Sequence, residues 1–440
     1  MQVAVLTLGT RGDVYPQLAL AEAFKRRGIG AVLAAGKEFR TMAEERGLGF
    51  VPVDLDYSAY MEEEQTKASY YGDSKARRTA QRDYLQRIMG LMLDAAWEAA
   101  RGCDALVYHP AFYPAVYAAE KLGVPAIVAS ATPIVTPTGE FPNLVVSGSS
   151  LGKTLNRLSY SARRIEMLMA HGGIARWCRE TLGVEPRSRF CDLLRPGGRP
   201  LPVLYGYSEF LLPSPRDWDT NTRVCGYWFM ESDPDDPKKR LSAEIEHFLA
   251  KGPEPVFIGF SSLPSEDGAR TARIIVEALE LSGQRGIIAF GSGAMPDIDF
   301  PETTLAVDYA PHNLLFPRVR AVVHHGGAGS VGASLRAGKP TVVCPVSQEQ
   351  RFWGALIHRE GLGPRPAPQS PSDRFTSLRL GEAIREAVEN PGIAARAAKI
   401  GAQIRSEDGA NEAVKAVLEI IERETSIKTS GASLHERIGK

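Results

Sequence analysis

The stretch AVVHHGGAGSVGASLRAGKP, residues 321–340, says the most about the fold of this chain. Its apolar start, residues 321–324, predicts a buried strand of a parallel sheet. Four small residues, 326–329, predict a loop, and a helix is expected to begin near Ser330. Glycine lets the backbone turn tightly and approach a ligand. The first turn of a helix adds unpaired N–H groups and a partial positive charge. The stretch therefore predicts a diphosphate site in an α/β fold.

This loop lacks the common nucleotide-binding signatures. The G-x-x-x-x-G-K-[ST] pattern is absent, and so is the Lys that it requires. Gly327, Gly329 and Gly332 do form a G-x-G-x-x-G pattern, but no acidic residue follows at the end of the next strand, where it would bind a ribose. A tight turn beside two packed histidines is the alternative interpretation. Ser330 either caps the helix or donates its hydroxyl to a phosphate.

The alternation of strands and helices continues on both sides of this stretch. Residues 3–35, 104–130 and 256–345 predict two doubly wound α/β sheets, with Pro16 at the start of the first helix. A charged, proline-bearing segment, 231–253, predicts a linker between a domain at 1–230 and a domain at 254–410. A helix at 411–424, crossing back toward the first domain, and a disordered tail at 425–440 complete the prediction. Ligands of such sheets bind at the carboxyl ends of the strands.

Composition excludes several classes of protein. Lys plus Arg and Asp plus Glu both number 52, so no charge excess indicates a nucleic-acid binder. Five scattered cysteines without a C-x-x-C pair favour a reducing, cytoplasmic setting. No apolar stretch approaches the ~20 residues of a spanning helix, so we expect no stable membrane insertion. The acidic run at 233–236 lies in the linker and is interpreted as solvated charge, not as a metal site.

Several motifs in a fixed order resemble the family of UDP-sugar and dTDP-sugar glycosyltransferases with the GT-B fold, which includes sterol glucosyltransferases and bacterial antibiotic glycosyltransferases. The motifs are GTRGDVYP at 9–16, VCGYWF at 224–229, FIGFSSLP at 257–264, APHNLLFPRVRAVVHHGG at 310–327 and CPVSQEQRFWG at 344–354. The resemblance covers nearly the whole chain. It implies that residues 1–230 bind the acceptor and that residues 254–410 bind the nucleotide sugar.

The resemblance also implies roles for individual residues of the donor site. His325 would contact the diphosphate, whereas His324 would be structural. Glu349 and Gln350 would bind sugar hydroxyls, as a carboxylate and an amide can; from the residues alone, an exposed loop is the alternative. The remaining donor-binding residues would be Ser262, Gly327, Ala328, Gly329 and Ser330.

By the same resemblance, Asp13 would be the general base that takes the proton of the acceptor hydroxyl. The alternative for Asp13 is a helix-capping role near Pro16. Arg11, in the same loop, would support Asp13 or the phosphate. His109, which ends a predicted strand, is a rival base or else a packed, acceptor-lining residue. The acceptor-binding candidates are Tyr15, His109, Phe112 and Phe141.

Three positions depart from the family pattern. Tyr15 stands in place of Gln, Ser261 in place of Gly, and Leu314 in place of the Trp of many sterol-type members. These departures affect expectations for acceptor contacts, phosphate approach and packing, and they leave Asp13 and His325 in place.

The reaction implied is an inverting transfer of a hexose from a UDP- or dTDP-sugar to a small apolar acceptor, either a natural product or a sterol-like lipid. The nucleotide sugar is a co-substrate, no other cofactor is expected, and no metal is required. A nucleotide-sugar 2-epimerase and a non-catalytic nucleotide-sugar-binding partner remain as alternatives. The motifs identify neither the acceptor nor an oligomeric state.

Overall fold

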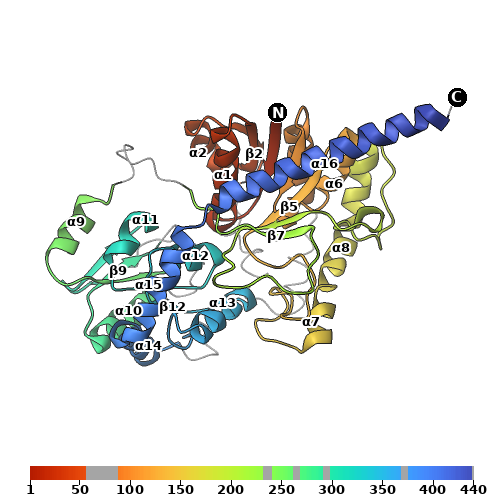
Figure 1. Cartoon of the computed structure of the whole chain (residues 1–440). Helices are drawn as coiled ribbons and strands as arrows, with labels where there is room; N and C mark the ends of the chain where they lie inside the picture. Colours follow the sequence, from red (N-terminus) through yellow and green to blue (C-terminus); the bar gives the residue numbers. More distant parts are fainter. Residues whose placement is uncertain (56–87, 231–239, 261–267, 291–297, 368–374, 439–440) are drawn as a thin grey trace.

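The computed structural model describes residues 1–55, 88–230, 240–260, 268–290, 298–367 and 375–438. Two separate parallel sheets, one of seven strands and one of five, form two lobes that lie side by side (Figure 1). We call the seven-stranded sheet with its helices the first lobe and the five-stranded sheet with its helices the second lobe. The predicted α/β class with two doubly wound parallel sheets is confirmed.

The first sheet has the strand order β3-β2-β1-β4-β5-β6-β7, and all neighbouring strands pair in parallel. Its order reverses between β1 and β4, where Leu6 pairs with Tyr108. Successive residues of β1 point to opposite faces, and both faces are buried, as expected of a central parallel strand. The strands are β1 (Gln2–Leu6), β2 (Gly30–Gly36), β3 (Gly49–Val53), β4 (Ala105–Tyr108), β5 (Ala126–Ser130), β6 (Val203–Tyr205) and β7 (Thr222–Val224).

The second sheet has the order β10-β9-β8-β11-β12 and is also parallel throughout. Its order reverses between β8 and β11. The strands are β8 (Val256–Gly259), β9 (Gly286–Ala289), β10 (Thr304–Val307), β11 (Ala321–His324) and β12 (Thr341–Val343). Each sheet therefore has one point where consecutive connections leave in opposite directions, and such a point is where open α/β sheets bind their ligands.

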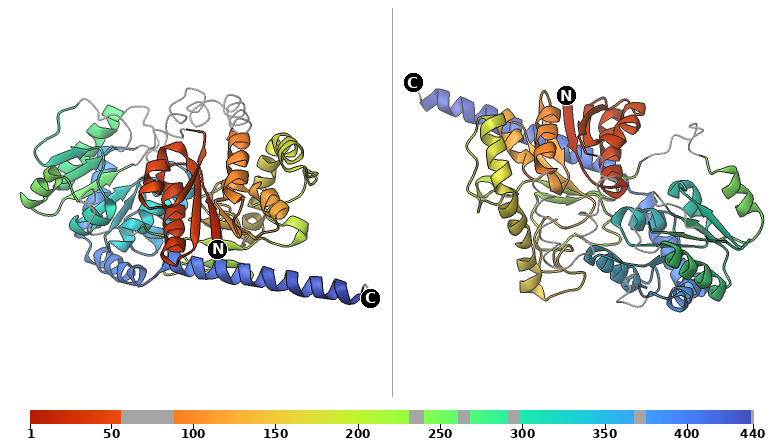
Figure 2. Two further views of the ribbon diagram at one scale, coloured as in Figure 1. Left: turned by 90° about the horizontal axis from the view of Figure 1, so that it is seen from above. Right: turned by 180° about the vertical axis from the view of Figure 1, so that it is seen from behind.

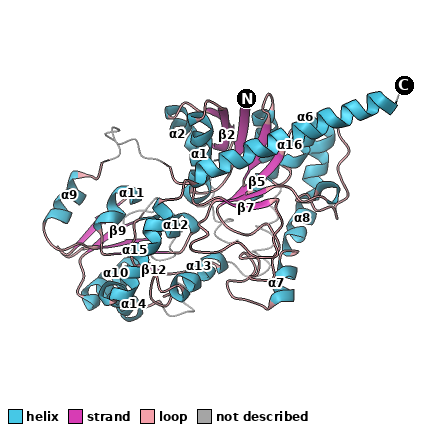
Figure 3. Cartoon of the chain, in the orientation of Figure 1, coloured by secondary structure: helices cyan, strands magenta, loops and turns pink. Residues whose placement is uncertain are grey.

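Helices cover the two sheets (Figure 3). Those of the first lobe are α1 (Arg11–Arg26), α2 (Arg40–Glu45), α6 (Ala115–Leu122), α7 (Lys153–Ser159) and α8 (Ala162–Trp177), and residues 88–100 are also helical. Those that follow are α9 (Ala243–Ala250), α10 (Gly268–Ser282), α11 (His312–Leu315), α12 (Ala328–Arg336), α13 (Gln348–Arg359), α14 (Ser377–Glu389), α15 (Pro391–Arg405) and α16 (Gly409–Ile438). Short turns of other helix types are Lys37–Phe39, Pro110–Phe112, Cys178–Leu182, Pro196–Gly198 and Phe316–Arg318.

Helix α1 begins at Arg11, so the prediction that Pro16 begins it is wrong. The reason is a capping box one turn earlier. The Thr10 side chain accepts from the first turn, and the Asp13 carboxylate accepts from the backbone N–H of Thr10. Pro16 consequently lies inside the helix.

Helix α16 returns from the second lobe and runs along the first, with its end extending beyond that lobe (Figures 1 and 2). It packs on α1, and residues from Ala410 to Ile421 join the apolar cluster that covers β1. Arg223 of β7 and Glu419 also form an ion pair at 2.6 Å. The prediction ended this helix at 424 with a disordered tail after it, whereas α16 is helical to Ile438. Residues 425–438 contain no proline and a single glycine, Gly431, so nothing in them breaks the helix.

A substitution in α16 tests whether this helix is part of the core of the first lobe. Val417 is fully buried among apolar side chains. Val417→Asp would place a carboxylate there without a partner and should lower the free energy of unfolding by ~3 kcal/mol or more. Lys415→Ala, on the exposed side of the same helix, should change it by less than ~0.5 kcal/mol. Chemical denaturation measures both, and equal effects would contradict the packing.

Candidate active site

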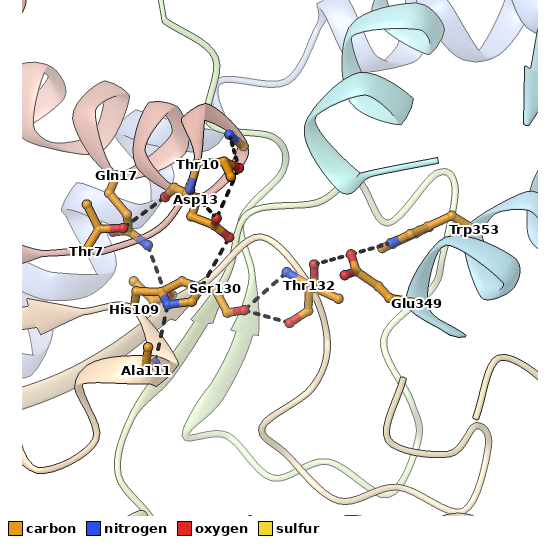
Figure 4. Close-up of polar contacts among 12 residues, drawn as sticks. Thr7, Thr10, Asp13, Gln17, His109, Ala111, Ser130, Thr132, Glu349 and Trp353 are labelled. Atoms are coloured by element: carbon orange, nitrogen blue, oxygen red, sulfur yellow. Dashed lines mark hydrogen bonds and ion pairs between the residues drawn. The ribbon is translucent and has the colours of Figure 1, made fainter. Parts of the chain in front are cut away.

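Asp13 and His109 come together at the reversal point of the first sheet. Asp13 lies in the first turn of α1, directly after β1, and His109 follows β4. Because β1 and β4 are neighbours, their carboxyl ends bring the two side chains together, with 4.0 Å between Asp13 Oδ1 and His109 Nε2 (Figure 4). The sequence named both residues, and the sheet order places them in one site.

The two carboxylate oxygens of Asp13 have different surroundings. Oδ2 accepts hydrogen bonds from the backbone N–H of Thr10 at 2.9 Å and from its hydroxyl at 3.3 Å. Gly9 has a φ of 136°, and a Cβ there would lie 2.2 Å from Oδ2, so only glycine fits beside the carboxylate. Oδ1 faces His109, and the Asp13 side chain is 42% exposed. Asp13 is thus both a capping residue, the alternative that the sequence left open, and a carboxylate available to a ligand.

The ring of His109 is oriented by the backbone. Its Nδ1 accepts from the N–H of Ala111 at 3.3 Å, so a neutral ring carries its proton on Nε2, toward Asp13. Burial lowers the pKa of His109 below its ordinary value, the charge of Asp13 partly opposes this, and Arg163 lowers the pKa further. His109 is therefore neutral at pH 7 and is suited to donate a hydrogen bond.

His324 holds the loop that follows β11. It is buried, its Nδ1 accepts from the N–H of Gly326 at 2.9 Å, and its Nε2 lies 3.4 Å from the hydroxyl of Ser334. Gly326 has a φ of 96°, a conformation that favours glycine. These contacts fit the structural role expected of His324.

Helix α12 presents an uncapped N-terminus next to His325. The helix begins at Ala328 with Gly327 as its N-cap, and no side chain in the part of the chain that the structure describes caps it. Ser330 is therefore not the cap, so that alternative for Ser330 is wrong, and the helix starts earlier than the sequence indicated. A Cβ on Gly329 would meet no atom of the described segments within 4 Å, which shows that they leave space at this end of the helix. The first N–H groups of α12 can thus receive an anion.

His325 lies directly against this helix end. A Cβ on Gly327 would lie 2.5 Å from its Nε2. Its Nδ1 is buried and has no hydrogen-bond partner among the described residues. Burial lowers the pKa of His325 to about 4, so the ring is neutral at pH 7 and one nitrogen carries a proton. An unpartnered buried ring nitrogen beside an uncapped helix end is the arrangement that a phosphate oxygen would complete.

Glu349 connects the two lobes. Its Oε1 accepts from the hydroxyl of Thr132 at 3.0 Å and from Trp353 Nε1 at 3.3 Å (Figure 4). Thr132 follows β5 and is fixed by Ser130, whose hydroxyl donates to the Thr132 carbonyl at 2.7 Å. Burial raises the pKa of Glu349, and repulsion from the Asp13 carboxylate raises it further. The residue expected to bind the sugar thus lies within electrostatic reach of the expected base.

Gln350 is engaged in local structure. It forms a capping box with Ser347 at the start of α13, and its Oε1 accepts from the N–H groups of Val346 and Ser347 at 2.8 and 3.1 Å. Its NH₂ group is the part that would reach a sugar.

Sequence reasoning missed two residues that join the lobes, Thr132 and Gln348. Gln348 Oε1 accepts from the N–H of Gly148 at 3.0 Å. The only signal for Thr132 was its position just after a strand of the first sheet.

The acceptor candidates lie in different environments. Phe112 is fully buried in the apolar core. Phe141 is also buried, and its ring centroid lies 5.5 Å from that of Phe352 on α13. Tyr15 is partly buried against the core of the first lobe. Of these three, only Phe141 contacts the second lobe through an aromatic pair.

The remaining sequence candidates are placed as follows. Ser261 and Ser262 lie outside the described residues. Leu314 packs against the apolar cluster between α9 and α11. Arg11 stacks on the ring of Tyr309, 5.3 Å from its centroid, and so reaches across to the second lobe.

The described ranges hold no group of three or more His, Cys, Asp or Glu side chains arranged to bind a metal ion. None of the described helices combines the length and apolar character needed to cross a bilayer.

Two family models match the chain. Residues 3–136 match the glycosyltransferase family 28 N-terminal domain, and residues 275–420 match the erythromycin biosynthesis protein CIII-like C-terminal domain. Sterol 3-beta-glucosyltransferase UGT80B1 of Arabidopsis thaliana is 32% identical over 432 residues, which cover 94% of this chain and 67% of the relative. The chain belongs to the glycosyltransferase family that includes this sterol glucosyltransferase. It is therefore a glycosyltransferase.

Other relatives are longer than this chain. UGT80A2 of the same plant is 31% identical, and the match covers 65% of its length. The sterol 3-beta-glucosyltransferase of Neurospora crassa is 29% identical over 454 residues, which cover 99% of this chain and only 28% of the fungal protein. The chain thus spans about two thirds of its plant relatives and less than a third of this fungal one.

Solved structures share the fold at low sequence identity. The glycosyltransferase of kitacinnamycin superimposes with a TM-score of 0.68 at 20% identity, covering 96% of this chain and 98% of that one. The calicheamicin glycosyltransferase CalG4 gives 0.69 at 16% identity, with coverages of 95% and 98%. These similarities confirm the GT-B architecture.

The partly buried position of Glu349 predicts a pH-dependent stability. Because folding raises its pKa, the ionised carboxylate destabilises the folded state above the unfolded pKa of 4.5. Glu349→Gln keeps an oxygen for Thr132 and Trp353 and removes the charge. The variant should therefore melt at a higher temperature than the parent at pH 7, and the difference should vanish below pH 4.5. Thermal melts across this range measure it. The exposed Glu382→Gln serves as control, and an equal shift in both variants would contradict the assignment.

Proposed function

We propose that the protein is an inverting glycosyltransferase that moves a hexose from a UDP- or dTDP-sugar to a hydroxyl of a small apolar acceptor. The observation that supports this proposal is that candidate residues stand at the point of each sheet where the strand order reverses. Asp13 stands at that of the first sheet, and His325 with the start of α12 at that of the second. The contacts of Glu349 with Thr132 and of Arg11 with Tyr309 hold these two points together.

The donor diphosphate would occupy the N-terminus of α12. The N–H groups of Ala328, Gly329 and Ser330 would hold its oxygens, and His325 would donate a hydrogen bond from its neutral ring. Burial lowers the pKa of His312, and His325 and the charge of Arg11 lower it further, so Arg11 lies near this site and its charge would also favour the diphosphate. Helix, imidazole and guanidinium together would offset the charge that develops on the leaving group. The proposed reaction therefore needs no metal.

The sugar would extend from the diphosphate toward Glu349. The carboxylate would exchange its bond with the Thr132 hydroxyl for bonds with sugar hydroxyls, and the NH₂ group of Gln350 would add a donor. Because Thr132 belongs to the first lobe and Glu349 to the second, this exchange would couple the binding of the sugar to the contact between the two lobes.

Asp13 would act as the general base through Oδ1. The acceptor oxygen attacks the anomeric carbon as its proton passes to Asp13, and the bond from that carbon to the phosphate oxygen breaks. The nucleoside diphosphate leaves with the electron pair from the opposite face, so the configuration inverts. His109, neutral and with its Nε2 proton toward Asp13, would orient the carboxylate.

The acceptor would lie beside Tyr15, His109 and Phe141, and the named activity of the plant and fungal relatives favours a sterol-like alcohol. The five cysteines are free, which agrees with a reaction in the cytoplasm.

A calorimetric titration with UDP, dTDP and GDP would identify the nucleotide class of the donor. One of these should bind, and His325→Ala should weaken it by about 10- to 100-fold, because a hydrogen bond to a charged group is lost. His247→Ala, an exposed histidine of α9, is the control and should bind as the parent does. If no nucleoside diphosphate bound at millimolar concentration, the proposal would fail.

Asp13→Asn tests the base. The amide keeps the cap on Thr10 and cannot take a proton, so kcat should fall by ~10²–10⁴ while nucleotide affinity is unchanged. Donor consumption is followed with and without a panel of apolar alcohols. Conversion of the donor without any acceptor would indicate the epimerase. Binding without any turnover would indicate a non-catalytic partner.

A further inference from the structure

Arg163 stands at a position of α8 where the helix should carry an apolar side chain. Met167 and Ala170 follow it four and seven residues later, which is the spacing of one helix face, and both are buried against the apolar cluster of the first lobe. The next residue along the helix, Arg164, differs, because its side chain is 62% exposed and lies 4.0 Å from Asp192. Arg163 therefore belongs to the inward face of α8, whereas Arg164 faces solvent.

The guanidinium of Arg163 lacks a counter-charge within the described part of the chain. Its Nη1 is buried, and none of the described residues forms a hydrogen bond with that nitrogen or an ion pair with the side chain. The residue as a whole is partly exposed, so one side of the guanidinium can be reached. Arginine is almost never buried without a partner, because a charge that leaves water must be compensated. This guanidinium is therefore available to an anion.

The charge of Arg163 reaches the acceptor side of the candidate active site. Burial raises the pKa of Tyr108 and Tyr205, and the guanidinium of Arg163 acts against this rise at both. Burial lowers the pKa of His109, the Asp13 carboxylate opposes this, and Arg163 lowers it further. Strand β4 ends at Tyr108 and strand β6 ends at Tyr205. The guanidinium therefore lies at the carboxyl edge of the first sheet, near the pair formed by Asp13 and His109.

Buried tyrosine hydroxyls at this edge also lack partners. Tyr108, Tyr160 and Tyr207 are at most 7% exposed, and no described residue forms a hydrogen bond with their hydroxyls. Tyr160 and Tyr207 lie near Tyr205, whose ring centroid is 5.7 Å from that of Tyr207 and whose hydroxyl accepts from the N–H of Thr136 at 2.9 Å. Burial raises the pKa of all three unpartnered tyrosines, so their hydroxyls stay protonated and can donate. Arginine and protonated tyrosines are donors that suit a carboxylate.

We propose that Arg163 binds a carboxylate of the acceptor, and that the acceptor is consequently an apolar hydroxy acid. The body of the acceptor stays apolar, as in the proposed function, and the carboxylate lies away from the hydroxyl that Asp13 deprotonates. A carboxylate suits this place because the planar guanidinium can donate two parallel hydrogen bonds to it. The donor diphosphate is not the partner of Arg163, because in the proposed complex it occupies the start of α12 in the second lobe. This inference rests on the proposed function in taking the ligand of the first lobe to be the acceptor.

Equilibrium binding tests the carboxylate site without any donor. A series of ω-hydroxy fatty acids of increasing chain length is titrated by calorimetry, and each acid is compared with its methyl ester. The acid whose length fits the site best should bind about 10- to 100-fold more tightly than its ester, because the ester cannot accept charge-assisted hydrogen bonds from the guanidinium. Arg163→Met should bind acid and ester equally. Arg163→Lys keeps the charge without the planar fork, so it should retain part of the preference.

The matched control is Arg164→Met, which removes the neighbouring arginine from the exposed side of the same helix. It should prefer the acid as strongly as the parent does. Equal binding of acid and ester by the parent would overturn the proposal. A preference for the acid that Arg163→Met retains would overturn it as well, because another group would then bind the carboxylate.

Turnover with a nucleotide sugar separates this inference from the proposed function. The preferred acid should be glycosylated with a kcat/KM about 10- to 100-fold above that of its ester in the parent, and without this advantage in Arg163→Met. Acid binding that depends on Arg163, with no transfer to any acceptor, would support the carboxylate site and contradict the proposed function. Transfer to esters and neutral alcohols with the same kcat/KM as to the acids would support the proposed function and overturn this inference.

Discussion

The structure depends on one constraint of parallel sheets, which is that the strand order must reverse if helices are to cover both faces. At the reversal, two neighbouring strands send their connections to opposite sides, and the residues that follow them face open space. In the first sheet these strands are β1 and β4, followed by Asp13 and His109. In the second they are β8 and β11, and His325 follows β11. Chemical groups far apart in the chain are thereby collected at two points.

Burial sets the electrostatic character of the site where these points meet. It lowers the pKa of His109 and His325 and raises that of Glu349, so the two imidazoles are neutral. Neutral imidazoles donate hydrogen bonds without adding charge. The positive potential for the proposed diphosphate would then come from the start of α12 and from Arg11, which contacts Tyr309. The hydrogen bond of Thr132 to Glu349 compensates that carboxylate, and in the proposed complex a sugar hydroxyl would replace it.

The sequence predicted the parts of this arrangement that are local and periodic. The stretch 321–340 predicted β11, its loop and α12, and the order of motifs predicted the family. The starts of α1 and α12 were misplaced because the capping box of Thr10 and Asp13 was overlooked and because Ser330 is a plausible cap. The bond between Thr132 and Glu349 joins residues 217 positions apart, and no local pattern encodes such a contact.

The central claim is that the start of α12 and His325 bind the diphosphate while Glu349 faces the sugar. A crystal structure of the protein with its nucleoside diphosphate tests this most directly. We expect phosphate oxygens within hydrogen-bond distance of the N–H groups of residues 328–330 and of one ring nitrogen of His325. A diphosphate bound elsewhere, with Nδ1 of His325 still unpartnered, would contradict the account.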